Sequence, residues 1–206
     1  MTYPTLDYEL ELWSSGYQYV VGIDEVGRGA WAGPVVVGAV VFSPQTQVPD
    51  GINDSKLLAP RIRENLSSQI KNTALSFSLG IVGVDFINKH GIGKATQSAM
   101  RQAIRNLDPK PDFHLIDAFY IKNLKKSNQK PIIKGDQKSC SIAAASIIAK
   151  VARDQMMVDL STKFPEYYFD SHKGYGTKRH QEAIRKNGFC NIHRASFNLG
   201  WITNND

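Results

Sequence analysis

Two adjacent carboxylates, Asp24 and Glu25, end an apolar stretch of the chain, and Gly27, Arg28 and Gly29 follow directly. Carboxylate oxygens are the ligands that Mg²⁺ and similar hard cations prefer. A backbone without side chains at Gly27 and Gly29 can approach a sugar or a phosphate closely. An arginine can hold a phosphate through two parallel hydrogen bonds. Together these residues indicate metal-assisted chemistry on a nucleic-acid backbone.

Two further acids, Asp117 and Asp136, also fall at the ends of predicted strands. In an open α/β sheet, the strand ends are where a site forms. Three or four carboxylates suffice to hold two cations, which can activate a water and stabilise the leaving oxygen of an in-line displacement. Without cations these acids would repel one another, and at least one would tend to bind a proton.

Ordinary structural roles remain open for these acids. A lone aspartate is more often a surface residue than a ligand. Asp136 precedes a predicted helix and could cap it, and Asp117 could close a turn. Consecutive strand residues also point to opposite faces. Asp24 and Glu25 can therefore share a site only if the strand ends or bends there, which the following glycines permit.

Other motifs for phosphate or metal binding are incomplete. The segment 27–33 resembles a dinucleotide fingerprint, but it has one residue too many and a predicted strand follows it. A P-loop reading fails because Asn88 and Ala95 replace required residues. Cys190 and His193 could form half of a zinc site, but no second cysteine pair accompanies them.

The elements that must position the acids can be read from hydrophobic periodicity. Valine-rich segments 17–23 and 34–42 predict two strands, and the glycine-rich turn between them predicts a hairpin. A helix of about 12 residues should begin at Pro60. Strand 74–83 should place Leu75, Phe77, Leu79 and Ile81 on one side. The remaining predicted elements are helix 94–107, strand 113–116 ending at Asp117, strand 131–134, the long helix 139–163 and helix 177–187.

This order predicts an α/β fold with a mixed sheet flanked by helices. The 206 residues suit one domain. We expect an N-terminal segment 1–17, a catalytic core 18–163 and a small helical C-terminal part 164–206 packed on the core.

Composition narrows the class of protein. The net charge of +6 and the pI of about 9.3 favour a polyanionic partner. Two cysteines fit a reducing compartment. The N-terminus does not read as a signal peptide, and the longest apolar runs are far shorter than the roughly 20 residues that span a bilayer. We expect a soluble, cytoplasmic protein with no membrane partner.

Several motifs, taken in order, resemble bacterial ribonuclease HII. They begin with Asp-Glu-Val-Gly-Arg-Gly at 24–29 and Ala-Gly-Pro-Val at 32–35. They continue with Asp-Ser-Lys at 54–56, Leu-Ile-Asp-Ala at 115–118, Lys-Gly-Asp at 134–136, the alanine-rich block 141–154, and His-Lys-Gly-Tyr-Gly-Thr at 172–177. Several long motifs in the same order as in the family indicate membership far more specifically than any single motif does. The resemblance covers roughly residues 18–197.

The resemblance implies a ribonuclease H-like fold. It also implies an endonuclease that hydrolyses the RNA strand of RNA–DNA hybrids and cuts 5′ to single ribonucleotides embedded in duplex DNA. With two-metal-ion catalysis by Mg²⁺ or Mn²⁺, the products would carry 3′-hydroxyl and 5′-phosphate ends. We expect a monomer.

The matching positions imply a role for each candidate residue. The catalytic metal ligands would be Asp24, Glu25, Asp117 and Asp136. The residues sensing the 2′-hydroxyl and the RNA–DNA junction would be Gly27, Arg28, Gly29 and Tyr175, and phosphate contacts are expected from Lys56, Lys173 and Lys178. One departure is Leu57, where the family often has a second lysine.

Two alternatives follow from these motifs. A ribonuclease HIII-like enzyme without junction preference would share the fold and metal chemistry. It would lack the Gly-Arg-Gly segment, and the segment 1–17 is too short for the N-terminal domain that it normally carries. A non-catalytic hybrid-binding module would keep the basic residues and lose the chemistry.

Overall fold

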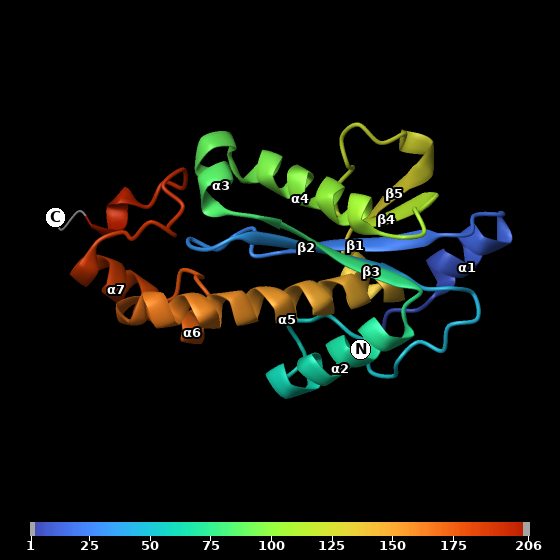
Figure 1. Cartoon of the computed structure of the whole chain (residues 1–206), viewed down its shortest axis with the longest axis horizontal. Helices are drawn as coiled ribbons and strands as arrows, with labels where there is room; N and C mark the ends of the chain where they lie inside the picture. The colour runs from blue at the N-terminus through green and yellow to red at the C-terminus, as the bar shows by residue number, and fades with distance from the viewer. Residues whose placement is uncertain (1–2, 204–206) are drawn as a thin grey trace.

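A five-stranded mixed sheet forms the centre of the computed structural model, which describes residues 3–203 (Figure 1). The strands lie in the order β3-β2-β1-β4-β5. β1 pairs antiparallel with β2, and β2 with β3, whereas the β1–β4 and β4–β5 pairs are parallel. The predicted hairpin and mixed sheet are therefore confirmed. The strand bounds are β1 (Val20–Val26), β2 (Val35–Val41), β3 (Ser76–Val82), β4 (Phe113–Asp117) and β5 (Gln129–Ile132).

Helices cover both faces of this sheet (Figure 1). α3 (Val84–His90) and α4 (Ile92–Asn106) lie on one face, and α2 (Pro60–Thr73) and α5 (Cys140–Lys163) on the other. The remaining helices are α1 (Asp7–Ser14), α6 (Phe169–His172) and α7 (Lys178–Asn187), with 3₁₀ turns η1 (Lys126–Asn128), η2 (Gly135–Gln137), η3 (Pro165–Tyr167) and η4 (Gly200–Ile202). Within residues 3–203, no helix is long and apolar enough to cross a membrane.

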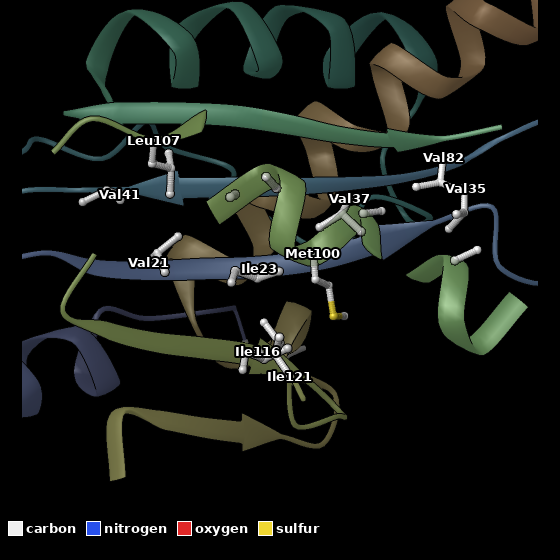
Figure 2. Packing of buried hydrophobic residues seen from close by; sticks show 14 of the residues in the cluster. Val21, Ile23, Val35, Val37, Val41, Val82, Met100, Leu107, Ile116 and Ile121 are labelled. Carbon is white, nitrogen blue, oxygen red and sulfur yellow. The ribbon is translucent and has the colours of Figure 1, made fainter. Parts of the chain in front are cut away.

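The core on the α4 face consists of valines and isoleucines of the central strands packed against the helix. Val21, Ile23 and Val37 point toward α4, and Met100 points back from it (Figure 2). These side chains are fully buried. Their burial fixes β1, and with it the direction in which the acids at its end project.

On the other face, α5 lies directly on the backbone of the sheet. A Cβ atom at Gly22 would meet the backbone of Ser141, and one at Gly38 would meet the carbonyl of Ala145. Alanines fill the first half of the helix and allow this close approach. Ser139 caps the helix by accepting a hydrogen bond from the backbone N–H of Ile142. The predicted long helix is confirmed, with its first residue shifted by one.

The N-terminal segment contains a helix that periodicity did not predict. Glu9 of α1 is fully buried, and its Oε1 accepts hydrogen bonds from the Ser139 and Ser141 hydroxyls and from the Ser141 backbone N–H. The segment is thus tied to the first turn of α5. Its first two residues, like residues 204–206 of the predicted C-terminal part, lie outside the described residues.

Other sequence predictions need adjustment. β1 is Val20–Val26, three residues later than the predicted strand 17–23, so Asp24 and Glu25 lie inside it and pair with Gly38 and Val37 of β2. β5 is Gln129–Ile132, two residues earlier than expected, because the chain turns into η2 after it. In β3 the apolar residues predicted to share one side are not its most buried ones, since Phe77 and Ile81 are each 39% exposed. Ser78 and Gly80 are buried instead, because they face α4 at close range. β3 lies at the sheet edge, where its other face is covered only in part.

Candidate active site

A cavity of about 650 Å³ opens beside the end of β1. It lies between the Gly-Arg-Gly loop, the middle of α5 and the segment around Tyr175. The predicted site residues that line it are Asp24, Glu25, Gly27, Arg28, Gly29, Lys56, Lys173 and Tyr175. Segments up to about 150 positions apart in the chain therefore meet at one place.

The four acids lie at three places in the chain. Asp24 and Glu25 are near the end of β1, Asp117 is at the end of β4, and Asp136 is in the turn η2 after β5. Asp24 is 5% exposed, and its Oδ1 accepts a hydrogen bond from the Glu25 backbone N–H at 2.7 Å. Asp117 ends β4, and its Oδ1 accepts a hydrogen bond from the Gly135 N–H at 2.7 Å. That bond ties β4 to the turn η2, which carries Asp136. Asp117 and Asp136 lie beside the cavity and do not line it.

Burial and mutual repulsion make these carboxylates hard to ionise together. Burial raises the pKa of Asp24 well above its ordinary value, and Glu25, Asp117 and Asp136 raise it further, against a hydrogen bond from Ser146. The pKa of Glu25 is raised to about 7, mainly by burial. The positive charge of Arg28 opposes this shift, and the negative charge of Asp117 adds to it. Burial is the main cause that raises the pKa of Asp136, and the neighbouring carboxylates of Asp54 and Asp117 raise it further. A cation would relieve this repulsion.

The donor set fits a hard divalent cation. Glu25 has a buried carboxylate oxygen, Oε2, without a hydrogen-bond partner among the described residues. Within residues 3–203, no group of three or more His, Cys, Asp or Glu side chains is placed so that it could hold a metal ion. The acids therefore suit Mg²⁺-type binding, in which one or two carboxylates share the ion with substrate phosphate and water.

The loop after β1 has one glycine that serves packing and one that faces open space. Gly27 has φ +86°, and a Cβ atom there would collide with the guanidinium of Arg153. At Gly29 a Cβ atom would meet nothing within 4 Å. The backbone at Gly29 is therefore open to a ligand. Between them, Arg28 lies 3.6 Å from Glu25 and stacks over the Phe119 ring at 4.4 Å.

Two fully buried arginines hold this loop through backbone carbonyls. Arg194 donates to the Arg28 carbonyl at 2.8 Å and to the Gly33 carbonyl at 2.9 Å. Arg153 donates to the carbonyls of Ala32 at 3.1 Å and Lys173 at 3.0 Å. The two guanidinium groups thus fix the Gly-Arg-Gly loop and join it to the segment that precedes Tyr175.

Tyr175 is held from several sides. Its ring lies 5.2 Å from the Arg153 guanidinium carbon and 5.6 Å from Lys150 Nζ. Its backbone N–H donates to the His172 carbonyl at 3.0 Å, and its carbonyl lies 3.0 Å from His180 Nδ1. The ring is half-buried and forms one wall of the cavity.

A chain of histidines continues behind Tyr175. The Cys190 backbone N–H donates to His193 Nδ1 at 2.9 Å, so the proton of that ring is on Nε2. His193 Nε2 lies 3.1 Å from His180 Nε2, which therefore accepts, and His180 Nδ1 donates to Tyr175. Burial lowers the pKa of His180 and of His193 to about 4, with His172 adding to both shifts. Neutral rings thus accept from the Cys190 N–H, link the two Nε2 atoms and donate to the Tyr175 carbonyl.

Three polar residues of α5 that line the site were missed from the sequence, namely Ser146, Lys150 and Asp154. All line the cavity from α5, and Lys150 pairs with Asp154 at 2.7 Å. Their spacing of four residues places them on one face of the helix. A polar stripe in an otherwise apolar helix was the signal that could have identified them.

The three predicted phosphate-binding lysines differ in position. Lys56 lies 3.8 Å from Asp136, and although burial alone would lower its pKa, the nearby carboxylates of Asp54 and Asp136 raise it. Lys173 lines the cavity. Lys178 is the exposed first residue of α7 and is not among the residues that line it.

Comparison with known proteins identifies the family. The ribonuclease HII family model matches residues 21–200. The chain belongs to the ribonuclease HII family. It is 50% identical over 190 residues to ribonuclease HII of Clostridioides difficile, covering 92% of this chain and 74% of that protein.

Solved structures of related enzymes support the fold. The ribonuclease H2 of Pyrococcus horikoshii superposes with a TM-score of 0.74 at 26% identity, over 90% of this chain and 97% of that one. A Bst-RNase HIII structure in complex with Mn²⁺ matches with a TM-score of 0.66 at 18% identity, over 90% and 69% of the two chains, and this match shows the fold alone. The ribonuclease H-like fold is confirmed.

Membership of this family also defines the activity. The protein is a metal-dependent endoribonuclease that acts on RNA–DNA hybrids and on ribonucleotides embedded in DNA. The prediction of ribonuclease HII is confirmed, and the alternatives of a ribonuclease HIII-like enzyme and of a non-catalytic module are not supported.

Proposed function

We propose that this enzyme cuts 5′ to the ribonucleotide and leaves 3′-hydroxyl and 5′-phosphate ends, with the divalent metal held by Asp24, Glu25, Asp117 and Asp136. The observation that carries the ligand assignment is electrostatic. The pKa of Asp24 is raised by burial and by all three of the other acids, so the four carboxylates act on one small region. When bound, the divalent cation lowers the pKa of the attacking water and stabilises charge on the leaving oxygen.

The Gly-Arg-Gly loop is proposed to recognise the ribose. A 2′-hydroxyl distinguishes RNA from DNA at a single position. The backbone at Gly29 is free of side-chain obstruction, so its N–H or C=O can meet that hydroxyl. Arg28 is half-buried beside Glu25, and its guanidinium can hold the adjoining phosphate bidentately. Arg153 and Arg194 keep the loop in place during this contact.

Tyr175 is proposed to pack against the deoxyribose next to the ribonucleotide. A deoxyribose presents an apolar face where a ribose carries a hydroxyl. The tyrosine ring forms a cavity wall, and its backbone is held on both sides by His172 and His180. A fixed aromatic ring favours the sugar that buries no unpaired hydroxyl against it.

Lysines are proposed to position the phosphates. Lys56 is protonated beside Asp136, and its exposed ammonium can reach a phosphate near the acids. Lys173 can do the same on the Tyr175 side. We further propose that Mg²⁺ or Mn²⁺ serves as the metal, that the enzyme is a monomer and that it acts in the cytoplasm.

One experiment tests the central proposal. A DNA duplex with a single ribonucleotide, labelled at the 5′ end of the cut strand, is incubated with the enzyme and Mg²⁺ or Mn²⁺, with and without EDTA. We expect one product that ends in a 3′-hydroxyl directly 5′ to the ribonucleotide, and no product with EDTA. An all-DNA duplex is the control. Cutting on the 3′ side of the ribonucleotide, or cutting that persists in EDTA, would contradict the proposal.

A further inference from the structure

A second hollow of about 700 Å³ adjoins the active-site cavity. Arg28 lines both, so the two lie on either side of this residue. The second hollow lies between the first three turns of α4, residues of α3 and the loop that follows β4. We call it the cationic groove. The lining residues used below are Arg28, Lys94, Gln97, Arg101, Tyr120 and Lys122, together with Phe119.

The cationic groove carries charge of only one sign. Lys94, Arg101 and Lys122 line it, and its lining contains no aspartate or glutamate. Within the described part of the chain, none of these three side chains forms an ion pair. Lys94 and Lys122 are exposed, and Arg101 is half-buried. Like charges gathered in a concave surface without internal partners attract a polyanion.

The groove has a fixed shape. Gln97 Nε2 donates to the Tyr120 carbonyl at 3.0 Å, and its Oε1 accepts from the Lys122 N–H at 2.8 Å. These two bonds fasten the loop after β4 to α4. The rings of Phe119 and Tyr120 remain 41% and 50% exposed, although large aromatic residues are commonly buried. They offer flat apolar surfaces between the cationic groups.

We propose that the cationic groove binds the sugar–phosphate backbone of the substrate duplex on one side of the cut, several nucleotides from the scissile phosphate. Lys94, Arg101 and Lys122 would contact phosphates, and Phe119 and Tyr120 would lie against sugars. This inference rests on the proposed function, because Arg28 joins the groove to the site where the ribonucleotide is held. Contacts of this kind position a duplex without reading its sequence.

Substrates extended on one side only provide the test. Three duplexes with one ribonucleotide are used: a short one, one lengthened only on the 5′ side of the ribonucleotide, and one lengthened only on the 3′ side. The variant is the triple substitution Lys94→Gln, Arg101→Gln and Lys122→Gln. For the wild type we expect a lower KM for one lengthened duplex than for the short one. The variant should lose that gain, with kcat and the KM for the short duplex unchanged.

Salt dependence gives an independent readout. Each phosphate contact contributes about 0.9 to the slope of log affinity against log salt concentration. The triple variant should therefore lower the slope for the responsive duplex by up to about 3. The matched control removes the same charges at exposed positions that line neither hollow, by Lys71→Gln, Lys163→Gln and Arg105→Gln. It should keep the wild-type KM advantage.

Each other outcome overturns the inference. If the triple variant loses activity equally on all three duplexes, the groove does not bind a distant part of the backbone. If KM and salt slope are unchanged, the charges do not meet phosphates. EDTA-sensitive cleavage of the short duplex by the wild type tests the proposed function separately, so failure of one proposal is distinguishable from failure of the other.

Discussion

His193 Nε2 lies 3.1 Å from His180 Nε2, and this contact links the backbone of Cys190 to the carbonyl of Tyr175 through two neutral imidazole rings. Both rings are buried, at 3% and 0% exposure. A proton added to either ring would place two N–H groups against each other or against the Cys190 N–H. The turn that carries Tyr175 therefore depends on uncharged histidines.

The contribution of these two histidines to protein stability should fall in mild acid for this reason. In the unfolded chain these histidines bind protons with a pKa near 6.5, whereas burial lowers their pKa in the folded protein to about 4. Between these values the two histidines bind more protons in the unfolded chain, so their contribution to the free energy of unfolding decreases as pH falls from about 6.5 to 4. Glu25 contributes the opposite slope, because its folded pKa of about 7 lies above its ordinary 4.5. Above pH 6.5 their full contribution is present. Urea unfolding of the wild type and of a variant that lacks one of these histidines, compared at several pH values, isolates this slope.

His180→Asn is the matched variant for the pH experiment. Its side-chain amide can still donate toward the Tyr175 carbonyl but cannot titrate. The variant should be less stable at neutral pH, because His193 Nε2–H loses its acceptor. Its stability should depend less steeply on pH between 6.5 and 4 than that of the wild type. An unchanged slope would mean that His180 binds no fewer protons when folded.

Replacement of Asp24 tests the metal-ligand assignment. Asp24→Asn removes a charged oxygen ligand while keeping the shape of the side chain. We expect cleavage to fall by more than about 100-fold, with hybrid binding mostly retained, because binding depends on basic residues. Cleavage of a single-ribonucleotide duplex and a filter-binding assay measure the two properties. Wild-type cleavage by the variant would show that Asp24 is not a ligand.

Replacement of Tyr175 tests recognition of the junction. Tyr175→Ala removes the ring, and burial of a large apolar side chain contributes about 1.5–3 kcal/mol. We expect a loss of roughly tenfold or more in kcat/KM for an embedded ribonucleotide, and a smaller loss for continuous hybrid. Tyr175→Phe keeps the ring and should keep most of this preference. Equal losses on both substrates would remove the proposed role.

The buried guanidinium of Arg194 should be indispensable for the loop. Lysine cannot reproduce the fork that reaches the carbonyls of Arg28 and Gly33. Arg194→Lys should lower the stability by about 2–4 kcal/mol and reduce kcat/KM on both substrates. Thermal melting and cleavage assays measure these effects. The exposed Arg179→Lys is the control, and a wild-type Tm for Arg194→Lys would show that its contacts add nothing.

Much of the fold was predictable because capping, helix-breaking and turn residues mark the same boundaries that the packed structure has. Ser139 and Pro165 bound the long helix as cap and breaker residues do, and the glycines after Glu25 correctly indicated a turn. Burial of Glu9 was not predictable. Its partners, Ser139 and Ser141, lie 130 and 132 positions away in the chain, and in sequence Glu9 looks like any surface acid.

The site was predictable only where residue type reveals chemistry. Asp24 and Glu25 stand out as acids within an apolar frame. Arg153 and Arg194 do not, because both bind backbone carbonyls, which leave no pattern of side chains to recognise. Gly27 could be read as permissive for a turn, but its fit against Arg153 requires the tertiary structure.

The contact between Arg194 and the Arg28 carbonyl spans 166 positions of the chain. During translation the carboxylates and the glycine loop emerge from the ribosome long before this arginine is made. A nascent polypeptide that stops short of it carries the residues of the site without the group that fixes their loop. Products that terminate before Arg194 should therefore be poor nucleases, which ties activity to synthesis past this residue.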